Sequence, residues 1–369
     1  MNLNKKILIT GCGGYLGSFL MPFLIKKGYQ VEGQDINFFK DCNLFQKKEL
    51  EKLIKYKDSE DLKLSDIENI DVVIHLAGIS NDPLNKLTSE SVYDPTRAYT
   101  LKIAKYCKAL NKKFIFASSC SVYGASKTTR FLDENSKTNP QTGYSLNKLQ
   151  IEGDLEAIAT ENFFPICLRF ATIFGVSPRI RFDVVINMLV GMVLTEKEIK
   201  LNSDGKAWRP HLYIEDACNV IEHAINYVKN KKNNKILILN VGRNDNNLRI
   251  IDVAKIIQKL VPNSKLEYLK TTAQNLKNNL FVDRKIKKGK DSRTYKVSFD
   301  SLNQKFGAIC SYTVEKGIKK MIDDLNKINF NKDIFKSKNF YRLQYLERLH
   351  EKNLIDDNLK WRTKKIKHK

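Results

Sequence analysis

Three side chains in the middle of the sequence have the types and the spacing of a proton-transfer site. Tyr144 and Lys148 are four residues apart in a segment with helical periodicity, so we expect both side chains on one face of a helix. Tyrosine is a poor base at its ordinary pKa of about 10, but a neighbouring ammonium group favours the phenolate. Tyr144 can then take the proton of a substrate hydroxyl while a hydride leaves the carbon that carries it. Ser119 follows a predicted strand and is placed to orient that hydroxyl.

Such a reaction needs a hydride acceptor, and the start of the chain predicts where one binds. Residues 5–10 form a short apolar run that breaks into glycines and continues with helical spacing, which indicates a strand, a tight turn and a helix. Gly11, Gly14 and Gly17 then allow the turn, the approach of a pyrophosphate and close packing of the helix on the strand. A second strand ends at Asp35, whose carboxylate can accept from the adenosine ribose and would repel a 2′-phosphate. The pattern therefore predicts NAD rather than NADP.

Strand and helix signals alternate through the first half of the chain. Residues 71–78 form an apolar run that ends in small residues, and residues 113–117 form another that leads to Ser119. The alternation is typical of an α/β fold, which we expect to be a Rossmann-type doubly wound parallel sheet with a smaller C-terminal substrate-binding region. His75 lies inside a predicted strand, and we expect a hydrogen-bonded core residue rather than a catalytic one. Asp58 follows the predicted third strand, where it either accepts from the adenine amino group or is solvated.

Together these motifs resemble the extended short-chain dehydrogenase/reductases, and within them the NAD-dependent epimerase/dehydratase group that acts on nucleotide sugars. The resemblance covers about residues 5–325. It rests on residues 10–17, Asp35, 75–78, 118–124, 144–148, 168–175 and 208–216. It implies an N-terminal NAD-binding domain, a smaller region for the sugar nucleotide, and a catalytic set formed by Ser119, Tyr144 and Lys148.

The resemblance also implies which residues contact the two ligands. The predicted NAD-binding residues are Gly11, Gly14, Tyr15, Leu16, Gly17, Asp35, Asp58, Leu76, Ala77, Gly78, Tyr144 and Lys148. The predicted substrate-binding residues are Ser119, Cys120, Ser121, Arg179, Arg181, Arg209 and Arg293. Arg209 and Arg293 match phosphate-contacting arginines of the family. Arg179 and Arg181 lie in a loop, where they either bind nucleotide phosphates or are solvated charges.

Two departures from the family pattern bear on the reaction. Members that eliminate water usually carry an acidic pair directly after the catalytic alcohol, and this chain has Cys120 and Ser121 there. A thiol and a hydroxyl are poor substitutes for carboxylates as general acid and base, so 4,6-dehydration is disfavoured. Thr96 stands four residues before Thr100, where the family usually has Asn, and this puts one usual contact in doubt.

The predicted function is that of an NAD-dependent nucleotide-sugar epimerase that works at C4 through a transient keto-sugar. The alternatives within the family are a nucleotide-sugar 4-dehydrogenase or reductase, or a decarboxylase if the substrate is a uronate. The alternatives outside enzymes are an NAD sensor and a nucleic-acid-binding protein. The intact set of Ser119, Tyr144 and Lys148 argues against a sensor. Steeply salt-dependent binding to nucleic acid would indicate the other alternative.

Composition limits the partners and the compartment. The chain has 369 residues and a formal net charge of +23, mainly from lysines that are spread through the sequence and mixed with asparagine. We interpret this excess as solvated faces, so no nucleic-acid partner is expected. Seven cysteines without close pairs indicate reduced thiols and no metal site, and no apolar run has the length of a membrane span. We expect a cytoplasmic protein that does not span a membrane, and a homodimer.

We expect three parts along the chain. Residues 1–175 form the NAD-binding domain with the catalytic residues, and residues 176–328 form the nucleotide-sugar-binding region, some of whose segments return to the Rossmann sheet. Residues 329–369 form a basic helical extension. In this extension, residues 339–349 are predicted as a helix that packs on its own domain or across a dimer contact. Residues 360–369 are interpreted as a solvated tail, with an anionic-surface anchor as the alternative.

Overall fold

A seven-stranded parallel sheet forms the centre of the computed structural model, which describes residues 4–45, 51–80, 89–126, 130–201, 203–229, 235–268 and 293–362. From edge to edge the strands are β11 (Leu237–Val241), β7 (Ile166–Phe170), β5 (Lys113–Ser119), β4 (Val72–His75), β1 (Lys6–Thr10), β2 (Gln30–Asp35) and β3 (Ile54–Tyr56). The strand order reverses between β1 and β4, which confirms the doubly wound arrangement. Ligands of such sheets bind outside the carboxyl ends of the strands at this reversal.

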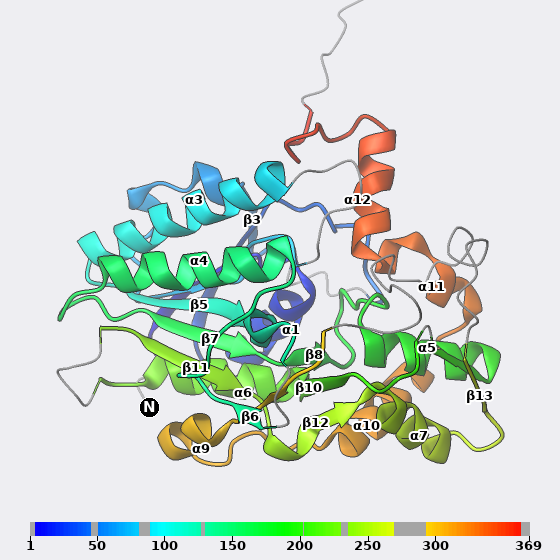
Figure 1. Ribbon diagram of the computed structural model, residues 1–369. Coiled ribbons are helices and arrows are strands. Elements are labelled where there is room, and N and C mark those ends of the chain that lie inside the picture. Colours follow the sequence, from blue (N-terminus) through cyan, green and yellow to red (C-terminus); the bar gives the residue numbers. More distant parts are fainter. Residues whose placement is uncertain are drawn as a thin grey trace, which may run out of the picture.

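Helices cover both faces of the sheet (Figure 1). The helices α3 (Ser89–Ala109) and α4 (Gly143–Ile158) pack together on one face, and α1 (Tyr15–Lys26) and α6 (Ile214–Asn226) pack together on the other. Ile7 and Ile9 of β1 contribute to the core with α1 and α6, whereas Leu8 contributes to the core with α3 and α4. A strand that is buried on both faces is apolar at every position, which explains the continuous apolar runs in the sequence.

The smaller region encloses a second apolar core. Its helices are α5 (Val185–Glu196), α7 (Ile250–Leu260), α10 (Val314–Asn326) and α11 (Lys332–Lys336), while α9 (Asp300–Phe306) packs beside β11. A three-stranded sheet consists of β12 (Asn247–Arg249), β10 (Trp208–Tyr213) and β8 (Thr172–Phe174). Two short pairs are β13 (Lys265–Tyr268) with β9 (Glu198–Leu201), and β14 (Lys296–Val297) with β6 (Phe131–Leu132). Short 3-10 turns lie at η1 (Ser59–Asp61), η2 (Leu64–Asp66), η3 (Cys120–Tyr123), η4 (Asn244–Asn246) and η5 (Lys338–Phe340).

The C-terminal extension packs on its own chain. The predicted helix is present as α12 (Arg342–Glu351), in which Tyr345 and Leu349 are buried. After α12 the chain folds back, so that Lys360 contacts Asp58 and Trp361 contacts Ile36. The interpretation of residues 360–369 as a solvated tail is therefore wrong for Lys360 and Trp361, because these two side chains have specific partners. Residues 363–369 lie outside the described residues.

Two further expectations concern membranes and thiols. None of the helices in the described ranges is both long and apolar enough to cross a membrane. All seven cysteines are buried free thiols, as the scattered spacing predicts.

Candidate active site

The glycine turn between β1 and α1 has the geometry of a phosphate cradle. Gly11 has a φ of +75°, and a Cβ there would lie 2.6 Å from the Ala77 nitrogen in the chain that leaves β4. Gly14 is the N-cap of α1 and provides no side-chain hydrogen bond, whereas Thr142 caps α4 through a reciprocal pair of bonds with Ser145. The backbone N–H groups at the start of α1 can therefore bind the pyrophosphate of a dinucleotide.

Asp35 lies beside this turn, at the carboxyl end of β2. The Gly13 N–H donates to Asp35 Oδ2 at 2.9 Å, and the Asn37 N–H donates to Oδ1 at 2.6 Å. Burial raises the pKa of Asp35, while the two N–H donors and the charge of Arg179 oppose that shift. A carboxylate has about four acceptor positions, so ribose hydroxyls can still bind to Asp35. Within the described chain, the neighbouring Asn37 Oδ1 is buried without a hydrogen-bond partner, and this also fits a polar ligand.

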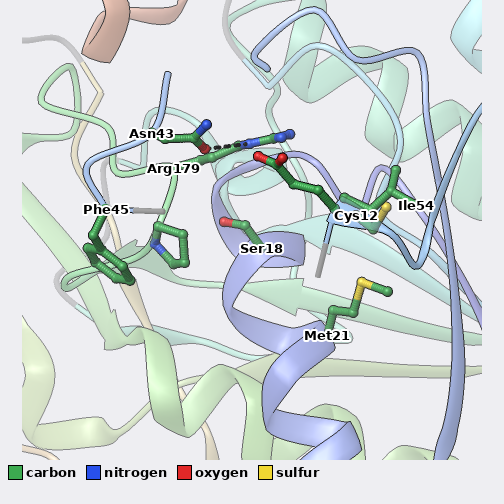
Figure 2. A pocket seen from close by; sticks show the side chains of 9 residues that line it. Cys12, Ser18, Met21, Asn43, Phe45, Ile54 and Arg179 are labelled. Carbon is green, nitrogen blue, oxygen red and sulfur yellow. Dashed lines mark hydrogen bonds between the residues drawn. The ribbon is translucent and has the colours of Figure 1, made fainter. Parts of the chain in front are cut away.

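Arg179 lies across the same turn. Its Nη1 donates to the Gly13 carbonyl at 2.6 Å and its Nε donates to Asn43 Oδ1 at 3.3 Å, the bond that is dashed in Figure 2. A cavity of about 30 Å³ lies beside Arg179, which is room for about one water molecule. The labelled side chains around it are Cys12, Ser18, Met21, Asn43, Phe45, Ile54 and Arg179 (Figure 2). The contacts of Arg179 therefore place it at the predicted cofactor turn.

The predicted catalytic residues meet where β5 ends and α4 begins. Lys148 Nζ donates to the Ala117 carbonyl of β5 at 2.7 Å, and it lies 5.7 Å from the centre of the Tyr144 ring. Ser119 is the last residue of β5, and its Oγ accepts from the Ser121 N–H at 3.1 Å. A hydroxyl that accepts such a bond still has its own proton to donate. The structure thus brings Tyr144 and Lys148 together beside the strand that carries Ser119.

The two arginines matched to phosphate contacts lie together. The guanidinium of Arg209, on β10, donates to the carbonyl oxygen of Arg293 and lies 5.5 Å from the centre of the Tyr295 ring. Arg181 has a different environment: its Nε donates to Asp183 at 2.8 Å and its Nη1 donates to Ser80 Oγ at 2.6 Å. Arg179 and Arg181 are only 4% and 8% exposed, so the alternative that they are solvated loop charges is wrong.

The structure shows the contacts of two further residues considered in the sequence analysis, His75 and Asp58. His75 is fully buried between Thr10 Oγ1 at 2.7 Å and Thr100 Oγ1 at 2.9 Å, and burial lowers its pKa to about 3. The expectation of a core histidine is confirmed. Asp58 lies just beyond β3, where Oδ1 accepts from the Glu60 N–H at 3.1 Å and Oδ2 accepts from Lys360 Nζ at 2.8 Å. Of the two alternatives for Asp58, full solvation is therefore wrong, and a contact with adenine stays a prediction.

Comparison with known proteins identifies the family to which these features belong. Residues 7–242, well over half of the chain, match the NAD dependent epimerase/dehydratase family. The chain belongs to this family. Its members include NAD-dependent nucleotide-sugar epimerases, dehydratases and decarboxylases.

Relatives in the epimerase/dehydratase family are distant. A Bacillus subtilis protein named as an uncharacterized UDP-glucose epimerase, YtcB, is 30% identical over 226 residues, which is 57% of this chain and 69% of the relative. A UDP-glucuronate 4-epimerase of Thermodesulfobacterium geofontis is 27% identical over 283 residues, 71% of this chain and 83% of the relative. Identities at this level establish the family and leave the individual reaction open.

Solved structures have the same fold. An NAD-dependent NDP-hexosamine 5,6-dehydratase involved in tunicamycin biosynthesis aligns with a TM-score of 0.71 and 20% identity, covering 88% of this chain and 98% of the other. A Bacillus cereus UDP-glucuronic acid 4-epimerase, solved with UDP-glucuronic acid and NAD, aligns with a TM-score of 0.69 and 22% identity, covering 88% of this chain and 99% of the other.

The two residues after Ser119, Cys120 and Ser121, have different surroundings. Cys120 is 1% exposed, and its Sγ donates to the Arg169 carbonyl at 3.0 Å. Burial raises the pKa of this thiol far above neutral pH. Ser121 Oγ is buried and, in the part of the chain that the structure describes, has no hydrogen-bond partner. Cys120 is thus held in the protein core, whereas the Ser121 hydroxyl can still bind a polar ligand group.

A buried charged network packs against α4, the helix that carries Tyr144 and Lys148. Glu152, one turn after Lys148 on α4, accepts from Arg169 Nη2 at 2.7 Å and from Ser118 Oγ. Arg169 Nη1 in turn donates to the Tyr123 hydroxyl at 3.0 Å. The network joins α4 to β5 and β7, so it fixes Tyr144 and Lys148 relative to Ser119. Sequence reasoning missed Glu152, although its spacing of four residues from Lys148 places it on the same helix face.

The close approach at Gly11 gives a prediction on stability. Gly11→Ala is expected to lower the free energy of unfolding by about 2–3 kcal/mol, because the new methyl group would collide with the Ala77 backbone at a positive φ. The matched control is Gly153→Ala on α4, where a Cβ meets nothing within 4 Å. That change is expected to raise the free energy by about 0.5–1 kcal/mol. Urea unfolding of the three proteins measures both effects, and a Gly11→Ala variant as stable as the wild type would contradict the described approach.

The buried amine of Lys148 gives a second prediction. Burial lowers the pKa of Lys148 from 10.5 to about 8, although Glu152 opposes the shift. The unfolded chain therefore binds more protons than the folded one between about pH 8 and 10.5, so this residue makes stability rise with pH across that window. Lys148→Met removes the cost of burying the charge, on the order of 2–3 kcal/mol at pH 7.

The expected result is a Lys148→Met variant that is more stable than the wild type at pH 7, with an advantage that shrinks between about pH 8 and 10.5 and is lost above this window. Its kcat is expected to fall by about 10²-fold or more because the phenolate loses its cation. Chemical unfolding at several pH values, together with an activity assay, measures both quantities. A stability difference that does not change with pH would show that Lys148 is not a buried cation.

Proposed function

We propose that the chain is an NAD-dependent nucleotide-sugar epimerase that inverts C4. The observation that carries this proposal is the environment of Cys120, whose thiol is buried against the Arg169 carbonyl. The resemblance described above implies that family members which eliminate water usually have an acidic residue at this position. A thiol with a raised pKa in that position cannot serve as the acid or base of an elimination at neutral pH. Removal and return of hydride at one carbon needs a single base, and Tyr144 can supply it.

The residues of the chain have distinct roles in this proposal. The glycine turn would hold NAD, which when bound would supply a hydride acceptor and, once reduced, a hydride donor for the opposite face of the sugar. Tyr144 takes the proton of the C4 hydroxyl, and the ammonium of Lys148 stabilises the phenolate. Ser119 donates a hydrogen bond that orients the same hydroxyl. Arg209 and Arg293 bind the diphosphate of the substrate, and the start of α1 binds the pyrophosphate of the cofactor.

Incubation with a panel of nucleotide sugars tests the proposal. We expect the C4 epimer to appear without net NADH, and, in heavy water, without deuterium at C4, because the hydrogen removed there is the one returned. Stoichiometric NADH would instead indicate a dehydrogenase, loss of carbon dioxide a decarboxylase, and loss of water a dehydratase. Each of these three outcomes would overturn the proposed reaction.

The proposal also includes the expected compartment and assembly. Buried free thiols at all seven cysteines suit the reducing cytoplasm. A homodimer is expected, and the native mass in solution measures it.

A further inference from the structure

The last described segment of the chain, residues 338–361, packs over the loop that follows Asp35. We call it the C-terminal strap; it consists of η5, α12 and a turn closed by an antiparallel bridge between Ile355 and Trp361. The red helix α12 lies beside the carboxyl-end side of the sheet in Figure 1. Side chains of the strap pack with side chains from the loop after Asp35 and from α3 in one apolar cluster. Its buried members are Phe38, Cys42, Tyr93, Tyr345, Leu346, Leu349, Ile355 and Leu359. Tyr144 packs against this same cluster, so the strap borders both the ribose-binding loop and the predicted base.

The polar contacts of the strap reach the chain just after β2 and just after β3. The Trp361 Nε1–H donates to the Ile36 carbonyl at 2.7 Å, and its ring centre is 5.5 Å from that of Phe38. Lys360 Nζ donates to Asp58 Oδ2 at 2.8 Å and also pairs with Glu60. Ile36 directly follows Asp35, and Asp58 lies two residues after the end of β3. In a doubly wound sheet, the adenosine half of a dinucleotide binds beside the ends of these two strands.

The two ends of the strap are held unequally. At its base, Arg342 is 4% exposed, its backbone N–H donates to Asp183 Oδ2 at 3.2 Å, and its Nη2 donates to the Arg179 carbonyl at 2.6 Å. At its tip, the Lys360 side chain is 40% exposed, and that of its partner Glu60, in η1, is 52% exposed. Leu359 in the tip has a φ of +54°, a conformation that is unfavourable for a residue with a side chain. Ile355 lies in the apolar cluster and holds the start of the turn, so local opening is expected to begin at the far end, where the side chains of Lys360 and Trp361 are partly exposed, while the base stays in place.

We propose that the tip of the strap, residues 359–361, closes the adenosine end of the NAD site, and that the dinucleotide enters and leaves only when the tip detaches. The inference rests on the proposed function, in which the cofactor is restored in every turnover and need not leave. If exchange passes through the open form, the association and dissociation rate constants are both multiplied by the fraction of molecules that are open. If Lys360 and Trp361 only hold the tip closed, replacing them changes both rate constants. If they contacted the cofactor directly, replacing them would change the dissociation rate constant alone.

Stopped-flow binding of NADH to the cofactor-stripped full chain tests the proposal, with dissociation measured by a chase with excess NAD. We expect Trp361→Ala to raise both rate constants by about tenfold, equivalent to 1.4 kcal/mol in the opening equilibrium, and to leave the Kd nearly unchanged. Lys360→Met is expected to raise both rate constants by a smaller factor. Lys360→Arg keeps the positive charge and is expected to leave both rate constants near the wild-type values. The matched control is Lys259→Met, which breaks an exposed pair with Glu315 far from the strap and should leave both constants at the wild-type value.

Three results would overturn the proposal. Unchanged rate constants in both variants would show that the tip does not limit exchange. A rise in the dissociation rate constant alone would show a direct contact in place of a closure. A wild-type chain that does not bind NADH would overturn this proposal together with the cofactor-binding site. By contrast, rate constants that respond as expected in a protein that forms no epimer would overturn only the proposed reaction.

Discussion

Tyr144→Phe is expected to lower kcat by about 10²–10⁴-fold, the usual contribution of a positioned acid or base. The substitution removes the hydroxyl group and leaves the ring, which packs against the cluster of the C-terminal strap. The loss should therefore appear in kcat, while the Kd for NADH and the free energy of unfolding stay close to those of the wild type. Steady-state kinetics on the nucleotide sugar identified in the panel, with fluorescence titration of NADH, measures these quantities.

The matched control for this change is Tyr268→Phe, because Tyr268 lies on β13 with 54% of its surface exposed. Its kcat should equal that of the wild type. If Tyr144→Phe were equally active, Tyr144 would not be the base. If Tyr144→Phe retained the full function in cells, the NAD-sensor alternative would be favoured.

Glu152→Gln is expected to lower the free energy of unfolding by about 3–5 kcal/mol, the usual cost of removing one partner from a buried ion pair. Glu152 and Arg169 have side-chain exposures of only 3% and 4%, so the remaining guanidinium would be a buried charge without its anion. The same change loosens the connection between α4 and β5, so kcat should fall as well. Urea unfolding monitored by circular dichroism measures the stability.

An exposed pair provides the control for Glu152→Gln. Glu32 pairs with Lys55 at 2.7 Å, with side-chain exposures of 47% and 72%, so Glu32→Gln should cost less than about 1 kcal/mol. The double variant Glu152→Met, Arg169→Met should regain part of the loss, since it leaves no unpaired charge. Equal effects of Glu152→Gln and Glu32→Gln would contradict the buried network.

The parts of the fold that local sequence could predict are those that depend on periodicity. The strands β1, β4 and β5 have apolar residues on both faces because helices cover both faces of the sheet, and the glycine spacing marks the turn after β1. Helix α7, residues 250–260, has a regular apolar face, and such a face is what helical periodicity in a sequence indicates. The neighbours Tyr144 and Lys148 could be paired for the same reason, since both lie on one short helix segment.

Contacts between distant parts of the chain could not be predicted in this way. Arg179 reaches Gly13 across 166 residues, and no local pattern indicates that a loop arginine lies on the first turn. Lys360 reaches Asp58 across 302 residues, from a segment whose lysine-rich composition is that of an exposed tail. In both cases tertiary packing selects the partner of a charge, and composition describes only how many charges there are.

The position of β11 has a consequence for how sugar specificity can change. The chain leaves the central sheet after β7, builds part of the smaller region, returns to add β11 to the edge beside β7, and then completes the smaller region. A fragment that ended at residue 175 would expose the unpaired backbone of β7, the kind of edge that promotes aggregation. The smaller region is thus not a separate unit that could be exchanged for another. New specificities on this scaffold have to arise by point substitutions and loop insertions within an uninterrupted chain.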